Sequence, residues 1–176
     1  MRSFFVLVLL GVSLATVAIV VRSGLYAREN PGKPINSAMR LALNREPQEL
    51  SAEDAAMIAR IYPNAQKTES GLLYIVHAPG TGEPPELGAR VTVNYEGRFL
   101  DGTKFDSTYD RKEPFVFAVG LGKVIRGWDE AFSEMHKGEK RTLIVPFWLG
   151  YGDQRRGVIP PRSTLVFEVE LVEIAP

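Results

Sequence analysis

Cysteine is absent from this chain of 176 residues, and histidine occurs only twice. Without cysteine the chain can form no disulfide, no thiolate metal site and no cysteine nucleophile, whichever redox compartment it occupies. His77 and His136 lie far apart in the sequence, and neither has neighbours spaced like metal ligands. A metal site is therefore not expected.

An excess of charge of either sign is also missing, because 21 basic residues face 21 acidic ones. No basic stripe or aromatic-interleaved basic run stands out, so nucleic acid is not an expected partner. The segment Gly120-Leu121-Gly122-Lys123 faintly resembles a phosphate-binding loop. Its glycine spacing is wrong, however, and Val124 replaces the required serine or threonine, so phosphate binding is not predicted.

One long uncharged segment is present, over residues 4–21 near the N-terminus. About 18 apolar residues is close to the lower limit for a helix that crosses a bilayer. A cleavable signal peptide usually has a shorter core and small residues before the cut, but the nearest candidate here, Leu25-Tyr26-Ala27, begins with a bulky residue. We therefore predict an uncleaved membrane anchor over residues 1–22, and a removable signal segment is the alternative.

Two further segments precede the main domain. Residues 23–50 contain several glycines and prolines among scattered charges, which predicts a linker. Residues 51–70 begin with Ser51, a good helix cap followed by two acids, and continue to Pro63. Apolar residues recur at helical spacing at Ala55, Ile58, Ala59 and Tyr62. We predict a short helix that packs against its own domain, with pairing to another copy as the alternative.

From residue 71 onward the pattern is that of strands, predicted over residues 72–77, 91–100, 115–119, 141–147 and 165–174. The last alternates apolar residues with Glu168 and Glu170, as in an antiparallel sheet exposed on one face. Gly97 indicates a bulge or a close backbone approach. One helix is predicted among the strands, with Ile125, Trp128, Phe132 and Met135 on one face and a stop at Lys137-Gly138. The expected fold class is α+β: a curved antiparallel β-sheet wrapped around one short α-helix, preceded by an N-terminal apolar helix.

Several short motifs occur in a distinctive order across residues 71–176. They are Val93-Asn94-Tyr95-Glu96-Gly97, Asp101-Gly102-Thr103-Lys104-Phe105-Asp106-Ser107, Pro114-Phe115, Gly122-Lys123-Val124-Ile125-Arg126-Gly127-Trp128, Leu149-Gly150-Tyr151-Gly152 and Ile159-Pro160-Pro161. No single motif is specific, but the ordered set resembles the FKBP family of peptidyl-prolyl isomerases. The resemblance implies an FKBP-like domain over 71–176 that works without a cofactor.

The resemblance also implies a set of site residues. The catalytic group would be Tyr95, Phe105, Asp106, Ile125, Trp128 and Tyr151, and the substrate-binding group would be Phe115, Val124, Ile159 and Phe167. Trp128 would form the floor of a prolyl pocket, and the Ile125 amide and Tyr151 hydroxyl would hold substrate carbonyls. Asp106 would lie near the twisting amide, or would orient neighbours such as Tyr95 or Arg126.

The chemistry suits an apolar pocket. Rotation about an X-Pro bond meets a barrier of about 18–20 kcal/mol because amide resonance is lost, and a pocket poor in water favours the twisted amide. We therefore predict a peptidyl-prolyl isomerase acting on X-Pro bonds of unfolded or newly exported polypeptides, with macrolides of the rapamycin type as expected inhibitors. A module that binds Pro-containing segments with little catalysis is the alternative.

Two features depart from the pattern of small family members. The loop over residues 152–158 is shorter and carries Arg155 and Arg156, which leaves the substrate preference open. Trp148 stands where a polar or acidic residue is usual, and it would either extend a binding surface or cover a sheet edge.

The orientation in the membrane has conflicting signals. Arg22, Arg28, Lys33 and Arg40 follow the apolar segment, whereas Arg2 precedes it, which favours a cytoplasmic domain. A single N-terminal anchor is nevertheless a common way to hold a folding factor on the exported side. We predict a single-pass anchor through residues 4–21 with the domain on the exported, periplasmic side, and a secreted or periplasmic protein after signal cleavage as the alternative.

Overall fold

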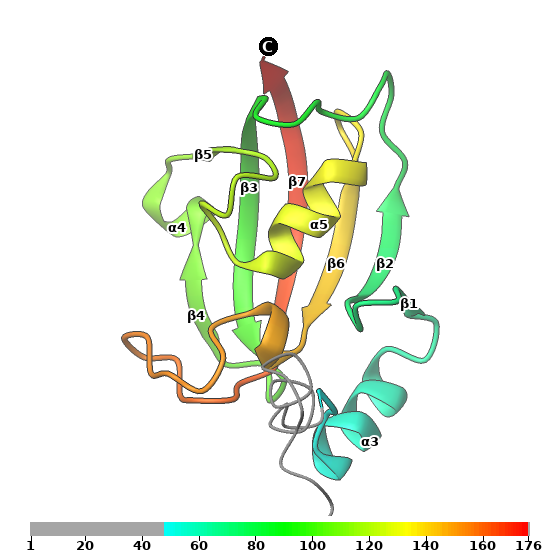
Figure 1. Ribbon diagram of the computed structural model, residues 1–176, viewed down its shortest axis with the longest axis vertical. Coiled ribbons are helices and arrows are strands. Elements are labelled where there is room, and N and C mark those ends of the chain that lie inside the picture. Colours follow the sequence, from blue (N-terminus) through cyan, green and yellow to red (C-terminus); the bar gives the residue numbers. More distant parts are fainter. Residues whose placement is uncertain (1–47, 176) are drawn as a thin grey trace, which may run out of the picture. The chain divides into compact units, whose positions relative to one another are not determined.

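The computed structural model describes residues 48–175, and the predicted anchor and most of the predicted linker lie outside this range. None of the helices within the described range is long and apolar enough to cross a membrane. The elements are α3 (Ala52–Ile61), β1 (Gln66–Lys67), β2 (Leu73–Ala78), β3 (Arg90–Phe99), β4 (Lys104–Ser107), α4 (Thr108–Arg111), β5 (Phe115–Ala118), α5 (Arg126–Glu134), β6 (Lys140–Val145), the 3-10 turn η1 (Phe147–Leu149) and β7 (Leu165–Ala175) (Figure 1).

The strands form one antiparallel sheet in the order β1-β2-β6-β7-β3-β4, and β5 pairs with the other end of β3. All five predicted strands are present within a residue or two of their expected limits. The sixth strand in the order, β4, and the short β1 and α4 were not predicted. The predicted strand over 141–147 ends at Val145 because Pro146 leads into η1.

The two faces of the sheet are covered differently. On the inner face, Phe167, Val169 and Leu171 of β7 are buried beneath α5, which crosses the sheet in Figure 1. On the outer face, Glu168 is exposed, as the alternation predicts. Val166, two residues before Glu168 on that outer face, is nevertheless buried, because α3 packs over it.

Helix α3 confirms the predicted packing against its own domain. The Ser51 hydroxyl accepts a hydrogen bond from the Asp54 backbone N–H at 3.0 Å and caps the helix. Ile58 is buried against Ile144 and Val166, and the Thr164 hydroxyl donates to the Asp54 carboxylate at 2.6 Å. Contrary to the predicted stripe, Ala55 and Ala59 are exposed, since the contact runs through Asp54, Ile58 and Tyr62.

Helix α5 begins where the sequence predicts but ends at Glu134, before the predicted stop. Met135 already has extended backbone angles, and Gly138 with φ of +84° belongs to the turn that leads into β6. Near the helix start, a side chain at Gly127 would place its Cβ 2.8 Å from Val145 Cγ1. The absence of a side chain at Gly127 thus lets the first turn of α5, and with it Trp128, lie directly on the sheet.

Candidate active site

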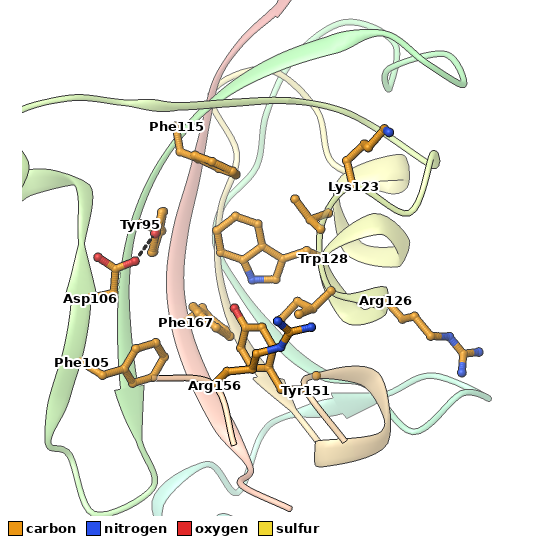
Figure 2. Close-up of a pocket in the computed structure, with 13 residues that line it drawn as sticks. Tyr95, Phe105, Asp106, Phe115, Lys123, Arg126, Trp128, Tyr151, Arg156 and Phe167 are labelled. Atoms are coloured by element: carbon orange, nitrogen blue, oxygen red, sulfur yellow. Dashed lines mark hydrogen bonds between the residues drawn. The ribbon is translucent and has the colours of Figure 1, made fainter. Parts of the chain in front are cut away.

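A cavity of about 440 Å³ opens between the start of α5 and strands β3, β4 and β7 (Figure 2). It is lined by Tyr95, Phe105, Asp106, Phe115, Lys123, Val124, Ile125, Arg126, Trp128, Gly150, Tyr151, Arg156 and Phe167. A volume of this size is within the ordinary range for small-ligand sites. The elements that supply these residues are far apart in the sequence, so the cavity depends on the complete fold.

Trp128 forms the centre of this cavity. Its indole ring is buried and packs edge-to-face against Tyr95 at 4.9 Å and Phe167 at 5.2 Å between ring centroids. Phe132, one turn later in α5, supports the ring from the core side at 5.4 Å. The buried Nε1 has no hydrogen-bond partner among residues 48–175. The indole is thus a rigid apolar platform with one unused donor.

Phe105 of β4 lies over Gly97 of β3, on the side of the cavity opposite α5. A Cβ atom at Gly97 would lie 2.7 Å from Phe105 Cζ and 3.0 Å from Phe167 Cε1. The pairing of β3 with β4 shifts register between Gly97 and Arg98, in agreement with the bulge predicted as one alternative at this glycine; the close contacts there are with aromatic side chains and not with backbone. Gly97 therefore leaves room for the Phe105 ring, which meets Phe167 edge-to-face at 5.7 Å.

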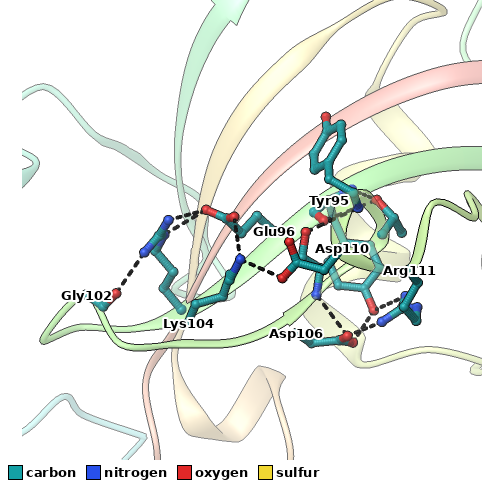
Figure 3. Close-up of polar contacts among 11 residues, drawn as sticks. Tyr95, Glu96, Gly102, Lys104, Asp106, Asp110 and Arg111 are labelled. Carbon is teal, nitrogen blue, oxygen red and sulfur yellow. Dashed lines mark hydrogen bonds and ion pairs between the residues drawn. The ribbon is translucent and has the colours of Figure 1, made fainter.

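Asp106 is held by three donors (Figure 3). Its carboxylate accepts hydrogen bonds from the Tyr95 hydroxyl and the Arg111 guanidinium, and from the Ser107 backbone N–H at 2.9 Å. Arg111 also donates to the Tyr95 hydroxyl at 3.2 Å. With these three donors, Asp106 fixes the position of the Tyr95 hydroxyl at the cavity wall. The cation that joins it is Arg111; Arg126 makes no such contact.

A second group of charges holds β4 in position. Lys104 contacts Glu96 of β3 at 3.6 Å and Asp110 of α4 at 2.5 Å, and Glu96 also pairs with Arg98 (Figure 3). These side chains are partly exposed, so each pair contributes little to stability. Their geometric effect is to connect β3, β4 and α4, the three elements that carry Tyr95, Asp106 and Arg111.

Two hydrogen-bonding groups face the cavity without partners among residues 48–175. The Ile125 backbone N–H, just before the first turn of α5, has no acceptor, and the Tyr151 hydroxyl makes no hydrogen bond. Burial and the nearby Asp106 carboxylate raise the pKa of Tyr151. Burial and the hydrogen bond to Asp106 likewise raise the pKa of Tyr95. Both phenols therefore keep their protons at neutral pH, and Tyr151 is available as a donor.

The structure brings the predicted site residues together, with one exception. Ile159 does not line the cavity; it is buried in the core, and its backbone N–H and C=O bond with those of Arg156. Trp148 does not extend the cavity either, since its indole donates to the Ser70 carbonyl at 3.0 Å and covers Gly71. The functional assignment of the other residues stays a prediction.

Sequence reasoning missed Arg111 entirely. Its position next to Asp106 depends on α4, a four-residue helix capped by the Ser107 hydroxyl and closed by Lys112 with φ of +57°. A Ser-Thr-Tyr-Asp-Arg sequence after Asp106 was the available signal, since serine caps a helix whose last turn would carry the arginine back toward the strand. Lys123, Gly150 and Arg156 were also not predicted to line the cavity.

The fold is an antiparallel sheet over one main helix, and the aromatic cavity opens between them. The family model for the FKBP-type peptidyl-prolyl cis-trans isomerase matches residues 81–172, more than half of the chain. This chain belongs to that family.

Individual relatives agree with this result. An FK506-binding protein of Neisseria meningitidis serogroup C is 49% identical over 94 residues, which are 53% of this chain and 86% of the relative. The peptidyl-prolyl cis-trans isomerase Fkbp12 of Drosophila melanogaster is 47% identical over 106 residues, 59% of this chain and 98% of the relative. The crystal structure of AtFKBP13 superposes with a TM-score of 0.61 at 35% identity, over 63% of this chain and 98% of that one.

Proposed function

We propose that this isomerase acts on X-Pro bonds of unfolded or newly exported polypeptides by binding the proline ring on Trp128 and twisting the preceding amide. The observation that carries the proposal is the cavity itself, in which a buried indole is surrounded by Tyr95, Phe105 and Phe167. A twisted amide has lost conjugation and part of its dipole, so a site that excludes water favours it over the planar forms. No proton or electron has to be transferred.

The polar groups position the substrate in this proposal. The Ile125 N–H and the Tyr151 hydroxyl, which have no partners within residues 48–175, donate to carbonyl oxygens on either side of the reacting bond. The fixed orientation of these donors reduces the freedom that the flexible peptide must lose at the transition state. Asp106 and Arg111 act through Tyr95, because their contacts lock the phenol in place as one wall of the cavity.

The decisive experiment is an isomerisation assay on the full chain in a mild non-ionic detergent, with short X-Pro peptides. We expect acceleration above the uncatalysed rate for at least some residues before proline, and loss of that acceleration when a macrolide such as rapamycin or FK506 occupies the cavity. If no peptide is accelerated while the protein still suppresses aggregation of an unfolded client, the alternative of a Pro-segment-binding chaperone is correct.

For the N-terminal part we propose a single-pass anchor through residues 4–21 that holds the domain on the exported side. The support is the length of the uncharged segment and the bulky residue before the nearest possible cleavage site. Mass spectrometry of the N-terminus of protein isolated from membranes is expected to recover Met1 or Arg2. A mature N-terminus beyond residue 22 contradicts the anchor.

A second experiment tests on which side of the membrane the domain lies. Protease added to intact spheroplasts should degrade a domain on the exported side, and full protection of the domain contradicts this orientation.

A further inference from the structure

We infer that the cavity selects X-Pro bonds in which X is glutamate or aspartate. The inference rests on the proposed isomerase function and concerns three basic side chains at the cavity rim: Lys123, Arg126 and Arg156. Figure 2 shows Arg156 beside Tyr151 and Lys123 next to the start of α5, whereas the Arg126 side chain is directed away from Trp128; all three are exposed. We call them the basic rim.

The charge around the cavity is strongly unequal. Lys123, Arg126 and Arg156 take part in none of the ion pairs formed among residues 48–175. The one carboxylate in the lining, Asp106, is already bound by Arg111 and Tyr95. Arg156 is thus the cation nearest to a ligand beside Tyr151, and Lys123 and Arg126 add longer-range attraction for an approaching anion at the same rim.

The basic rim is carried by anchored backbone. Arg156 exchanges backbone hydrogen bonds with the buried Ile159 at 3.0 and 2.9 Å, so the short loop turns back on itself next to the cavity. The segment before Lys123 is fixed from the other side, because the Asp129 carboxylate accepts from the Gly122 N–H at 2.7 Å and the Gly120 N–H at 3.0 Å. Arg126 is the first residue of α5.

These positions suit the residue before proline. With the proline ring on Trp128, the amide to be twisted lies between the aromatic walls, and the side chain of X projects to the mouth of the cavity. A carboxylate there gains attraction from the basic rim, whereas a lysine is repelled. A single exposed ion pair changes a binding or rate constant by roughly 1.5- to 5-fold. The preference is therefore expected to be measurable without being absolute.

The test compares peptides that differ only in X, with Glu, Gln, Leu or Lys before a Pro-Phe pair and with blocked ends. The full chain is used in non-ionic detergent, and exchange is followed by NMR so that no coupling protease adds its own preference. At about 20 mM salt we expect kcat/KM for Glu-Pro to exceed that for Gln-Pro by about threefold, with Lys-Pro slowest. At about 0.5 M salt the screening length is much shorter, and the difference should nearly vanish.

Two matched variants test whether the preference for Glu-Pro depends on the basic rim. Arg156→Glu is expected to abolish the preference for Glu-Pro over Gln-Pro, because it replaces the rim cation beside Tyr151 with a negative charge while Lys123 and Arg126 remain. Arg155→Glu makes the same change in charge one residue earlier, at an exposed side chain that does not line the cavity, and should keep the preference for Glu-Pro.

The possible results distinguish the preference for Glu-Pro from the isomerase activity itself. Equal rates for Glu-Pro and Gln-Pro at low salt, in a protein that accelerates both, overturn the inference and leave the isomerase intact. A loss of the preference in Arg155→Glu as complete as that in Arg156→Glu also overturns it, because net charge would then explain the selectivity. Failure to accelerate any peptide overturns the proposed function and the inference with it.

Discussion

Asp106→Ala is expected to lower kcat/KM by at least about tenfold, a loss of about 1.4 kcal/mol in transition-state stabilisation. The substitution removes the common acceptor of the Tyr95 hydroxyl and the Arg111 guanidinium. The Tyr95 ring would then lose its fixed position, and the cavity would lose its negative charge. The same variant should reduce the free energy of unfolding by less than about 1 kcal/mol, since the carboxylate is partly exposed and surface pairs contribute little.

The matched control for this prediction is Asp110→Ala. Asp110 is the carboxylate of the neighbouring helix α4; it pairs with Lys104, has a side chain 59% exposed, and does not line the cavity. It should keep nearly full activity. Equal losses of activity in the two variants, or a loss of stability at Asp106 that matches its loss of activity, would show that Asp106 is a structural residue only.

Ile58→Ala should lower the free energy of unfolding by about 2–4 kcal/mol, because it removes a buried side chain and leaves a cavity between α3 and the sheet. Ile58 is 4% exposed, and the outer-face residues Ile144 and Val166 depend on it for cover. Urea unfolding followed by tryptophan fluorescence measures the change, since Trp128 and Trp148 both lie within the folded domain.

Ile61→Ala is the control, with the same substitution on the same helix. Ile61 is 44% exposed and should lose less than about 1 kcal/mol. If both variants unfold at the wild-type urea concentration, α3 does not stabilise the domain and its contact with the sheet is incidental. If both lose the same large amount, the loss does not arise from the contact of Ile58 with the sheet.

The long elements of the fold were predictable because their hydrophobic periods are clear. Strand β7 alternates apolar and acidic residues from Phe167 to Leu171, and α5 buries Trp128, Ala131 and Phe132 on one face. Strand β4 and helix α4 were not predictable in this way, since each has only four residues. Their conformations depend on pairing with Glu96, Gly97 and Arg98 of β3 and on capping by Ser107, and neither effect leaves a period in the sequence.

The predictions for the site were limited in the same way, because residues on short segments leave no period in the sequence. The aromatic lining was predicted from the family resemblance of the ordered motifs and not from periodicity, since Phe105 lies on the short β4 and Tyr151 lies in a turn. Ile159 was placed in the lining by its neighbours in the motif, but its side chain points to the core while its backbone supports Arg156. Arg111 and Arg156 could not be placed, since a long charged side chain on a short turn is positioned by contacts across the fold.

The position of β7 at the centre of the sheet also bears on how the domain forms. Arg90 pairs with Ala175 and Phe99 with Leu165, so the partners are separated by more than a third of the chain. Pairings over such distances slow folding, because the connecting loop must close before the ladder forms. On the ribosome, β3 and β6 emerge before β7, which lies between them, so the edges that they present to β7 stay unpaired until residues 165–175 have been made. A protein proposed to assist unfolded chains thus itself exposes unpaired strand edges during its own synthesis.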